Sequence, residues 1–139
     1  MRILIAEDDG TSRRFLLKFL SQYGECDLTV DGLEALDAFL LSVKEKNPYD
    51  LVCLDIMMPK VDGVKVLKTI RTLEKENGVA TENRVKAIMI TALGETEYVQ
   101  QAFAIGCEAY AAKPVDTEKL VQVMQKLGLI KTGTGELSS

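Results

Sequence analysis

The chain has 139 residues, of which 47% are hydrophobic and 27% are charged, and its formal net charge at pH 7 is −4. This length and balance predict a single globular domain with a real core rather than a disordered chain. The acidic character argues against direct nucleic-acid binding, and no apolar run approaches the roughly 20 residues of a membrane-spanning helix. We therefore expect neither nucleic acid nor a membrane among its partners.

The N-terminal sequence and the cysteines indicate a cytoplasmic location. Acidic residues 7–9 interrupt the first apolar run, which therefore lacks the pattern of a signal peptide. Cys26, Cys53 and Cys107 are odd in number and widely spaced. We interpret them as small core residues in a reducing cytosol rather than as metal ligands or redox groups.

Five short apolar runs predict β-strands, and a helical pattern follows each of them. The strands are expected at residues 3–6, 26–30, 51–54, 86–90 and 109–112. The apolar helix faces comprise, in chain order, Phe15, Leu16, Phe19 and Leu20; Leu33, Leu36, Phe39, Leu40 and Val43; Val66, Leu67, Ile70 and Leu73; Val99, Ala102 and Phe103; and Leu120, Val123, Met124 and Leu127.

Polar residues mark the ends of these elements. Thr11 or Ser12 is expected to cap the first helix, and Asp116 or Thr117 the last. Residues 74–84 are polar and contain glycine, and they predict the longest connector of the chain.

The alternation of strands and helices predicts the fold class. Five β–α units of this length require right-handed crossovers and a parallel sheet that is covered by helices on both faces. We therefore expect one α/β domain, a doubly wound (βα)5 sheet, over residues 1–127. Residues 128–139 turn to Lys, Thr, Gly and Ser and are expected to form a flexible tail.

Chemically active side chains follow four of the predicted strands. Asp8 and Asp9 come after the first strand, Asp55 after the third, Thr91 after the fourth and Lys113 after the fifth. Parallel strands bring such residues to one edge of the sheet, where open α/β sheets bind ligands. Three carboxylates, a hydroxyl and an ammonium group at that edge predict a divalent-metal and phosphoryl site.

The carboxylates favour a hard cation. Adjacent aspartates that face a third carboxylate repel one another, and a bound ion relieves the repulsion. Oxygen ligands suit Mg²⁺, with Mn²⁺ or Ca²⁺ as competitors. The alternative interpretation of Asp8 and Asp9 is that they only begin the first helix, as acidic residues often do.

The other three side chains suit phosphoryl chemistry. Asp55 can act as a nucleophile toward phosphorus once a metal neutralises the approaching oxygens. Lys113 supplies a mobile positive charge, and Thr91 supplies a hydroxyl donor. Either residue alone is more often structural, so the prediction depends on their joint placement at successive strand ends.

Four segments in order give the chain a family resemblance. They are Ile-Ala-Glu-Asp-Asp (5–9), Asp-Leu-Val-Cys-Leu-Asp-Ile-Met-Met-Pro-Lys-Val-Asp-Gly (50–63), Met-Ile-Thr-Ala (89–92) and Ala-Tyr-Ala-Ala-Lys-Pro (109–114). Over residues 2–127 the chain resembles the receiver domain of two-component response regulators, in the stand-alone form typified by chemotaxis and sporulation regulators. The resemblance implies the flavodoxin-like strand order 2-1-3-4-5.

The resemblance also assigns roles around a magnesium ion. It implies that Asp55 is the phospho-acceptor and that Asp9 and Asp55 bind Mg²⁺ directly, with the backbone carbonyl of Met57. Asp8 would reach the ion largely through water. Lys113 would pair with the phosphoryl group.

A second set of implied roles concerns switching. Thr91 would move to hydrogen-bond the phosphoryl group, Ala92 would leave access to the site, and Tyr110 would turn inward. The Lys113–Pro114 bond would be cis, and partners would read the state on the face made by the fourth helix, fifth strand and fifth helix. Apolar residues two positions after the phospho-acceptor and after Thr91, which are Met57 and Leu93, predict slow autodephosphorylation.

These observations favour a signalling switch that takes a phosphoryl group from a partner's phosphohistidine. The partner would be a histidine kinase or a histidine phosphotransfer protein, because the chain has no histidine. The chain ends soon after the fifth predicted helix, so we expect output through another protein. Beyond its own phosphorylation and dephosphorylation we expect no enzymatic activity.

Three alternatives remain open. A magnesium-dependent aspartyl phosphatase of the haloacid-dehalogenase type needs a second Asp where this chain has Met57. A dinucleotide or flavin binder needs a glycine-rich first turn, and acidic residues 7–9 occupy that turn. A pseudo-receiver that only binds a partner usually lacks one or more of the five site residues.

Overall fold

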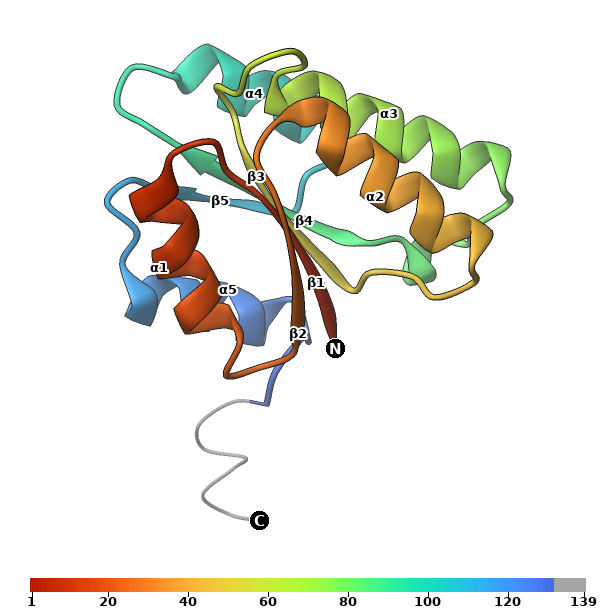
Figure 1. The fold of residues 1–139 in the computed structure, drawn as a ribbon, viewed down its shortest axis with the longest axis horizontal. Coiled ribbons are helices and arrows are strands. Elements are labelled where there is room, and N and C mark those ends of the chain that lie inside the picture. Colours follow the sequence, from red (N-terminus) through yellow and green to blue (C-terminus); the bar gives the residue numbers. More distant parts are fainter. Residues whose placement is uncertain (132–139) are drawn as a thin grey trace.

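The computed structural model describes residues 1–131, which form one parallel sheet with helices on both faces (Figure 1). The elements are β1 (Arg2–Ala6), α1 (Gly10–Leu20), β2 (Glu25–Thr29), α2 (Gly32–Lys44), β3 (Leu51–Asp55), α3 (Gly63–Glu76), the 3₁₀ turn η1 (Thr81–Asn83), β4 (Lys86–Thr91), α4 (Thr96–Ile105), β5 (Ala109–Ala112) and α5 (Thr117–Lys126). The strand order is β2-β1-β3-β4-β5, so the predicted fold and order are confirmed.

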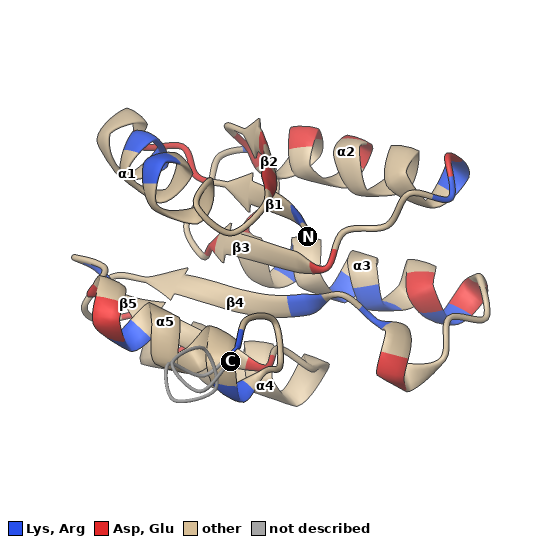
Figure 2. Ribbon diagram, turned by 90° about the horizontal axis from the view of Figure 1, so that it is seen from below, with Lys and Arg blue, Asp and Glu red and all other residues tan. Residues whose placement is uncertain are grey.

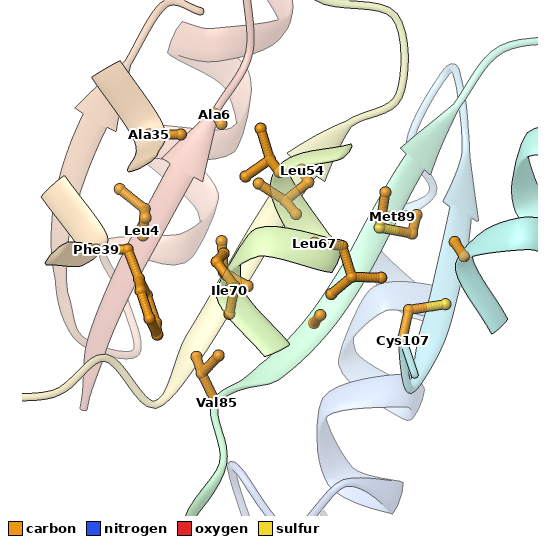
Figure 3. Packing of buried hydrophobic residues seen from close by; sticks show 14 of the residues in the cluster. Leu4, Ala6, Ala35, Phe39, Leu54, Leu67, Ile70, Val85, Met89 and Cys107 are labelled. Atoms are coloured by element: carbon orange, nitrogen blue, oxygen red, sulfur yellow. The ribbon is translucent and has the colours of Figure 1, made fainter. Parts of the chain in front are cut away.

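Two hydrophobic clusters fill the spaces between the sheet and its helices. Strand residues such as Leu4, Leu54 and Met89 face α2, α3 and α4 (Figure 3). Their neighbours along the strands, including Ile5 and Cys53, face α1 and α5. Because each face of a fully buried strand packs against a different helical layer, β1, β3 and β4 are apolar throughout their interiors, as parallel strands usually are.

Charge is kept to the ends of the central strands. Figure 2 shows that β3 and β4 carry charged residues only at their ends, while α2, α3 and α5 carry both signs, α1 only basic residues and α4 only an acidic one. Cys53 and Cys107 are buried and all three cysteines are free, which agrees with their interpretation as core residues. Within residues 1–131, none of the helices is long and apolar enough to cross a membrane.

Several helix boundaries differ from the sequence-based expectation. Asp9, rather than Thr11 or Ser12, is the N-cap of α1, whereas Asp116 caps α5 as predicted. The connector predicted at residues 74–84 is shorter, because α3 continues to Glu76.

The predicted tail at residues 128–139 lies mostly outside the described residues. Leu129 and Ile130, at its start, pack against the cluster beneath α1 and α5. We therefore place these two residues with the domain.

Candidate functional site

The register of the sheet brings the polar residues at the ends of four strands to one edge. Ala6 pairs with Leu54, so the residues that follow β1 lie level with Asp55. Asp55 pairs with Ile90, and Ile90 pairs with Ala111, so Thr91 lies one residue and Lys113 two residues beyond the level of Asp55. Parallel pairing alone therefore brings the backbone positions of Asp55, Thr91 and Lys113 to the same edge of the sheet.

Lys113 lies between two buried carboxylates. Its Nζ is 2.9 Å from Glu7 Oε1 and 3.3 Å from Asp55 Oδ2. Glu7 is fully buried and Asp55 is 4% exposed, so water screens these charges weakly. Burial alone would lower the pKa of Lys113, but its contacts with Glu7 and Asp55 raise that pKa above its usual value.

Glu7, Asp8 and Asp55 form a compact acidic cluster. One carboxylate oxygen from each lies within 4.8 Å of the others. Burial, together with the neighbouring Glu7 and Asp8, raises the pKa of Asp55 to about 8, and the positive charge of Lys113 opposes this shift. The cluster therefore has more negative charge than one ammonium group can balance, which is the condition a divalent cation relieves.

The structure places Glu7, and not Asp9, in this cluster. The Asp9 carboxylate instead accepts a hydrogen bond from the Ser12 backbone N–H at 2.9 Å, and this bond lowers the pKa of Asp9. In the structure the Asp9 carboxylate therefore caps α1 and lies outside the acidic cluster, whereas the family resemblance implied that it would bind a metal directly. The sequence signal for Glu7 was its position: it follows Ala6 as Asp55 follows Leu54.

Backbone contacts fix the acidic turn after β1. The Glu7 N–H donates to Thr29 O at 3.1 Å, and the Asp9 N–H donates to Glu7 Oε2 at 3.2 Å. Arg13 Nη1 donates to the carbonyl oxygens of Glu7 and Asp8 at 3.0 and 3.2 Å. These contacts hold the carboxylates in place despite their mutual repulsion.

The loop after β3 passes close to Asp55. A Cβ atom at Gly63 would lie 2.3 Å from the Asp55 carbonyl oxygen, so only glycine fits there. The Gly63 N–H donates to Ile56 O at 2.8 Å, which closes the loop before α3. Met57, in this loop, is half exposed beside the acidic cluster.

The loop after β4 holds Thr91 through a neighbouring acid. Thr91 is buried, and its Oγ1 donates to Glu95 Oε1 at 3.0 Å. The Ala92 N–H donates to the same oxygen at 2.6 Å. Leu93 is fully exposed at the tip of the loop. Thr91 therefore reaches the predicted edge with its hydroxyl already engaged by Glu95, a contact that the sequence did not predict.

Two further predictions concern the segment around β5. Tyr110 is 52% exposed, and its ring packs edge to face against Phe103 with 6.2 Å between centroids, so the side chain points outward. The Lys113–Pro114 peptide bond is cis, as the resemblance implied. An open cavity of about 220 Å³ lies between α1 and this segment, with Phe15, Lys113 and Pro114 in its wall.

Comparisons with known proteins place the chain in a family. Residues 3–125 match the response regulator receiver domain. The chain is 31% identical over 124 residues to the chemotaxis protein CheY of Treponema pallidum, covering 87% of this chain and 78% of that protein. Other curated relatives are longer: the chain spans 55% of a probable transcriptional regulator and 12% of a probable histidine kinase.

Solved structures agree on the fold. The CheX-CheY-BeF3-Mg complex from Borrelia burgdorferi matches with a TM-score of 0.78 and 27% identity, covering 92% of this chain and 89% of that one. The receiver domain of Ssk1, in complex with the Saccharomyces cerevisiae histidine phosphotransfer protein Ypd1, matches with a TM-score of 0.77 and 26% identity, covering 92% and 88%. The chain therefore belongs to the response regulator receiver domain family and is CheY-like in fold.

Proposed function

We propose that this receiver accepts a phosphoryl group from a partner's phosphohistidine onto Asp55, in a magnesium-dependent reaction, and thereby changes which protein it binds. The observation that carries the proposal is the acidic cluster of Glu7, Asp8 and Asp55, in which Glu7 and Asp55 are buried and Asp8 is exposed, with Lys113 between the two buried carboxylates. The donor would be a histidine kinase or a histidine phosphotransfer protein.

The residues present fit a magnesium ion, with Mn²⁺ as a substitute. Glu7, Asp8 and Asp55 offer the hard oxygen ligands that both ions prefer, and the backbone carbonyl of Met57 would complete the set from this chain. A bound ion would supply positive charge to the phosphoryl oxygens and lower the pKa of Asp55. Asp9 remains in our proposal only as the cap of α1.

The chemical step is a transfer between nitrogen and oxygen. An Asp55 carboxylate oxygen attacks phosphorus and the phosphorus–nitrogen bond of the donor breaks. The imidazole takes the electron pair of that bond and, because its other ring nitrogen already carries a proton, leaves as neutral histidine. The product is an aspartyl phosphate. Lys113 would move its ammonium group from Glu7 and Asp55 to the new phosphoryl oxygens, and Thr91 would donate its hydroxyl to another of them.

Charge then drives the switch. The phosphoryl group adds about −1.5 to −2 charge at pH 7, which draws the Thr91 and Lys113 loops toward it. Tyr110 would turn inward as Thr91 moves, which would break its contact with Phe103. The surface changed in this way comprises α4, β5 and α5, where we expect the downstream protein to bind.

Two neighbouring structures support the choice of ligands and partners. CheY of Borrelia burgdorferi was solved with BeF3 and Mg in complex with CheX, and the receiver domain of Ssk1 was solved with a histidine phosphotransfer protein. We infer a cytoplasmic location from the three free cysteines, two of them buried.

The side chains that flank the site favour a long-lived phosphoryl group. Met57 is 50% exposed and Leu93 is fully exposed, and neither can orient a hydrolytic water, while Ala92 leaves the approach open. We therefore expect slow autodephosphorylation. A half-life of seconds in the presence of Mg²⁺ would contradict this part of the proposal.

The test is intact-protein mass after incubation with acetyl phosphate and Mg²⁺. One base-labile phosphate should appear on the wild-type chain, and none on Asp55→Asn or after addition of EDTA. Steady release of inorganic phosphate from many substrate molecules would instead indicate an aspartyl phosphatase. No adduct with acetyl phosphate or with a phosphohistidine donor would indicate a pseudo-receiver.

A further inference from the structure

Glu95 occupies the hydroxyl that phosphorylation would need. A single oxygen of its carboxylate accepts the Thr91 hydroxyl at 3.0 Å and the Ala92 N–H at 2.6 Å, and the Ala92 carbonyl oxygen, at 3.2 Å, is a second, more distant acceptor for the same hydroxyl. Thr91 is 5% exposed, so water competes weakly for this bond. Hydrogen bonds to a carboxylate are about twice as strong as those between neutral groups.

The Glu95 side chain turns away from the helix that it precedes. Glu95 is the residue before α4, yet its carboxylate makes no capping bond to that helix. Gly94, with φ of +90°, lets the backbone reverse direction immediately before it. The carboxylate at the start of α4 is therefore directed back to the end of β4.

We propose that Glu95 is a latch that holds Thr91 away from Asp55 in the unphosphorylated chain. The inference rests on the proposed function, in which Thr91 donates its hydroxyl to the phosphoryl group. A threonine hydroxyl has one proton, so it cannot donate to Glu95 and to a phosphoryl oxygen at the same time. Phosphorylation must break the latch, and the latch therefore opposes the phosphorylated conformation.

The latch also connects the site to the surface that partners would read. Glu95 O accepts the first helical bond of α4, from Val99 N–H at 3.1 Å. The same helix carries Phe103, whose ring contacts Tyr110. When the Glu95 carboxylate releases Thr91 and Ala92, the start of α4 is no longer held to the end of β4. The change that frees Thr91 therefore also loosens the surface around Tyr110.

The test uses beryllofluoride, a mimic of the phosphoryl group, with Mg²⁺ and the full chain. Fluorine NMR measures its affinity for the wild type, Glu95→Ala, Glu95→Gln and Glu97→Ala. Glu97 is the matched control, because it is an exposed acid in the first turn of α4 with no hydrogen bond or ion pair to any described residue. We expect Glu95→Ala to bind about tenfold more tightly, Glu95→Gln to be intermediate and Glu97→Ala to match the wild type.

A gain in affinity separates the latch from a structural role. Damage to α4 or to its loop would lower the affinity for beryllofluoride, whereas loss of a competing acceptor raises it. In a Thr91→Val background the gain from Glu95→Ala should shrink, because the hydroxyl that Glu95 holds is absent.

The outcomes distinguish this inference from the function on which it rests. Tight binding by the wild type with no gain in Glu95→Ala would overturn the latch and leave the proposed function standing. The same gain in Glu97→Ala would also overturn it, because the effect would then be one of general charge. Failure of the wild type to bind beryllofluoride with Mg²⁺ would overturn both.

Discussion

Two clusters of charged side chains lie within this domain. Only one of them is complete, in the sense that each of its carboxylate oxygens accepts a hydrogen bond. The first surrounds Arg71 of α3, which is 10% exposed and donates to Glu74, to Glu108 and to the carbonyl oxygens of Val85 and Gly106. The second surrounds Lys113, whose ammonium group faces the acidic cluster after β1 and β3. Both contain one cation and more than one carboxylate.

The difference between them is in their hydrogen bonds. In the Arg71 cluster every carboxylate oxygen accepts a hydrogen bond: Glu74 Oε2 accepts the Val85 N–H at 2.7 Å, and Glu108 Oε1, which also accepts from Arg71, accepts the Ala87 N–H at 2.6 Å. In the acidic cluster Glu7 Oε1 is buried and accepts no hydrogen bond, although Lys113 Nζ lies near it. The first cluster ties α3 to the segments that lead into β4 and β5, while in the second we propose that a bound Mg²⁺ supplies the missing positive charge.

The largest expected effect comes from breaking the complete cluster. Arg71→Ala would leave Glu74, which is 3% exposed, as an unpaired buried charge. We expect it to lower the free energy of unfolding by about 3–5 kcal/mol in urea denaturation. The matched control is Lys68→Ala, an exposed position on the same helix, which should change stability by less than about 0.5 kcal/mol. Equal effects of the two variants would contradict this account of Arg71.

Substitutions in and beside the incomplete acidic cluster should change the affinity of the chain for Mg²⁺. We expect Glu7→Gln to weaken Mg²⁺ binding at least about tenfold in calorimetric titration, because it removes one buried charge beside the ion. Asp9→Asn should leave the Mg²⁺ affinity within about a factor of two. The reverse ranking would restore the sequence-based assignment of Asp9 as a ligand.

Removing the Asp55 carboxylate should stabilise the metal-free chain. A pKa of about 8 for Asp55 means that the folded state holds a proton that the unfolded state releases near pH 4, so stability falls as pH rises from 4 through 8. In EDTA at pH 8, Asp55→Asn should raise the free energy of unfolding by about 0.5–2 kcal/mol. The gain should disappear toward pH 4, and a gain that is independent of pH would contradict its electrostatic origin.

The smallest expected effect concerns the helix cap. Asp9→Ala should lower the free energy of unfolding by about 1 kcal/mol, since the Ser12 N–H loses its acceptor, whereas Asn at this position caps almost as well as Asp. Thermal unfolding of Asp9→Ala and Asp9→Asn side by side measures the difference. Indistinguishable stabilities would show that the Asp9 bond contributes little.

The sequence predicted the features that depend on strand ends. Apolar runs located β1, β3, β4 and β5, and parallel pairing then placed Asp55, Thr91 and Lys113 at the same edge of the sheet without further information. The pattern did not show which of three consecutive acids faces Asp55. That choice depends on where the strand stops and the helix cap begins, because a shift of two residues along the chain would exchange Glu7 and Asp9.

Longer-range contacts were also missed. Glu74 begins the predicted polar connector, and Glu95 lies between the fourth predicted strand and the helix after it, yet Glu74 is buried beside Arg71 and Glu95 bonds Thr91. Composition assigns such residues to solvent, and only the folded chain shows the partners that make the burial of Glu74 favourable. Charged residues in predicted loops are therefore the positions where sequence reasoning was weakest here.

The most direct test of the incomplete acidic cluster is a crystal structure of the chain with Mn²⁺, located by its anomalous scattering. Our account predicts an ion at Asp55 that is also held by Glu7 and Asp8, with the Asp9 carboxylate still bonded to the Ser12 N–H. An ion bound through Asp9, or no ion near Asp55 at saturating Mn²⁺, would contradict it.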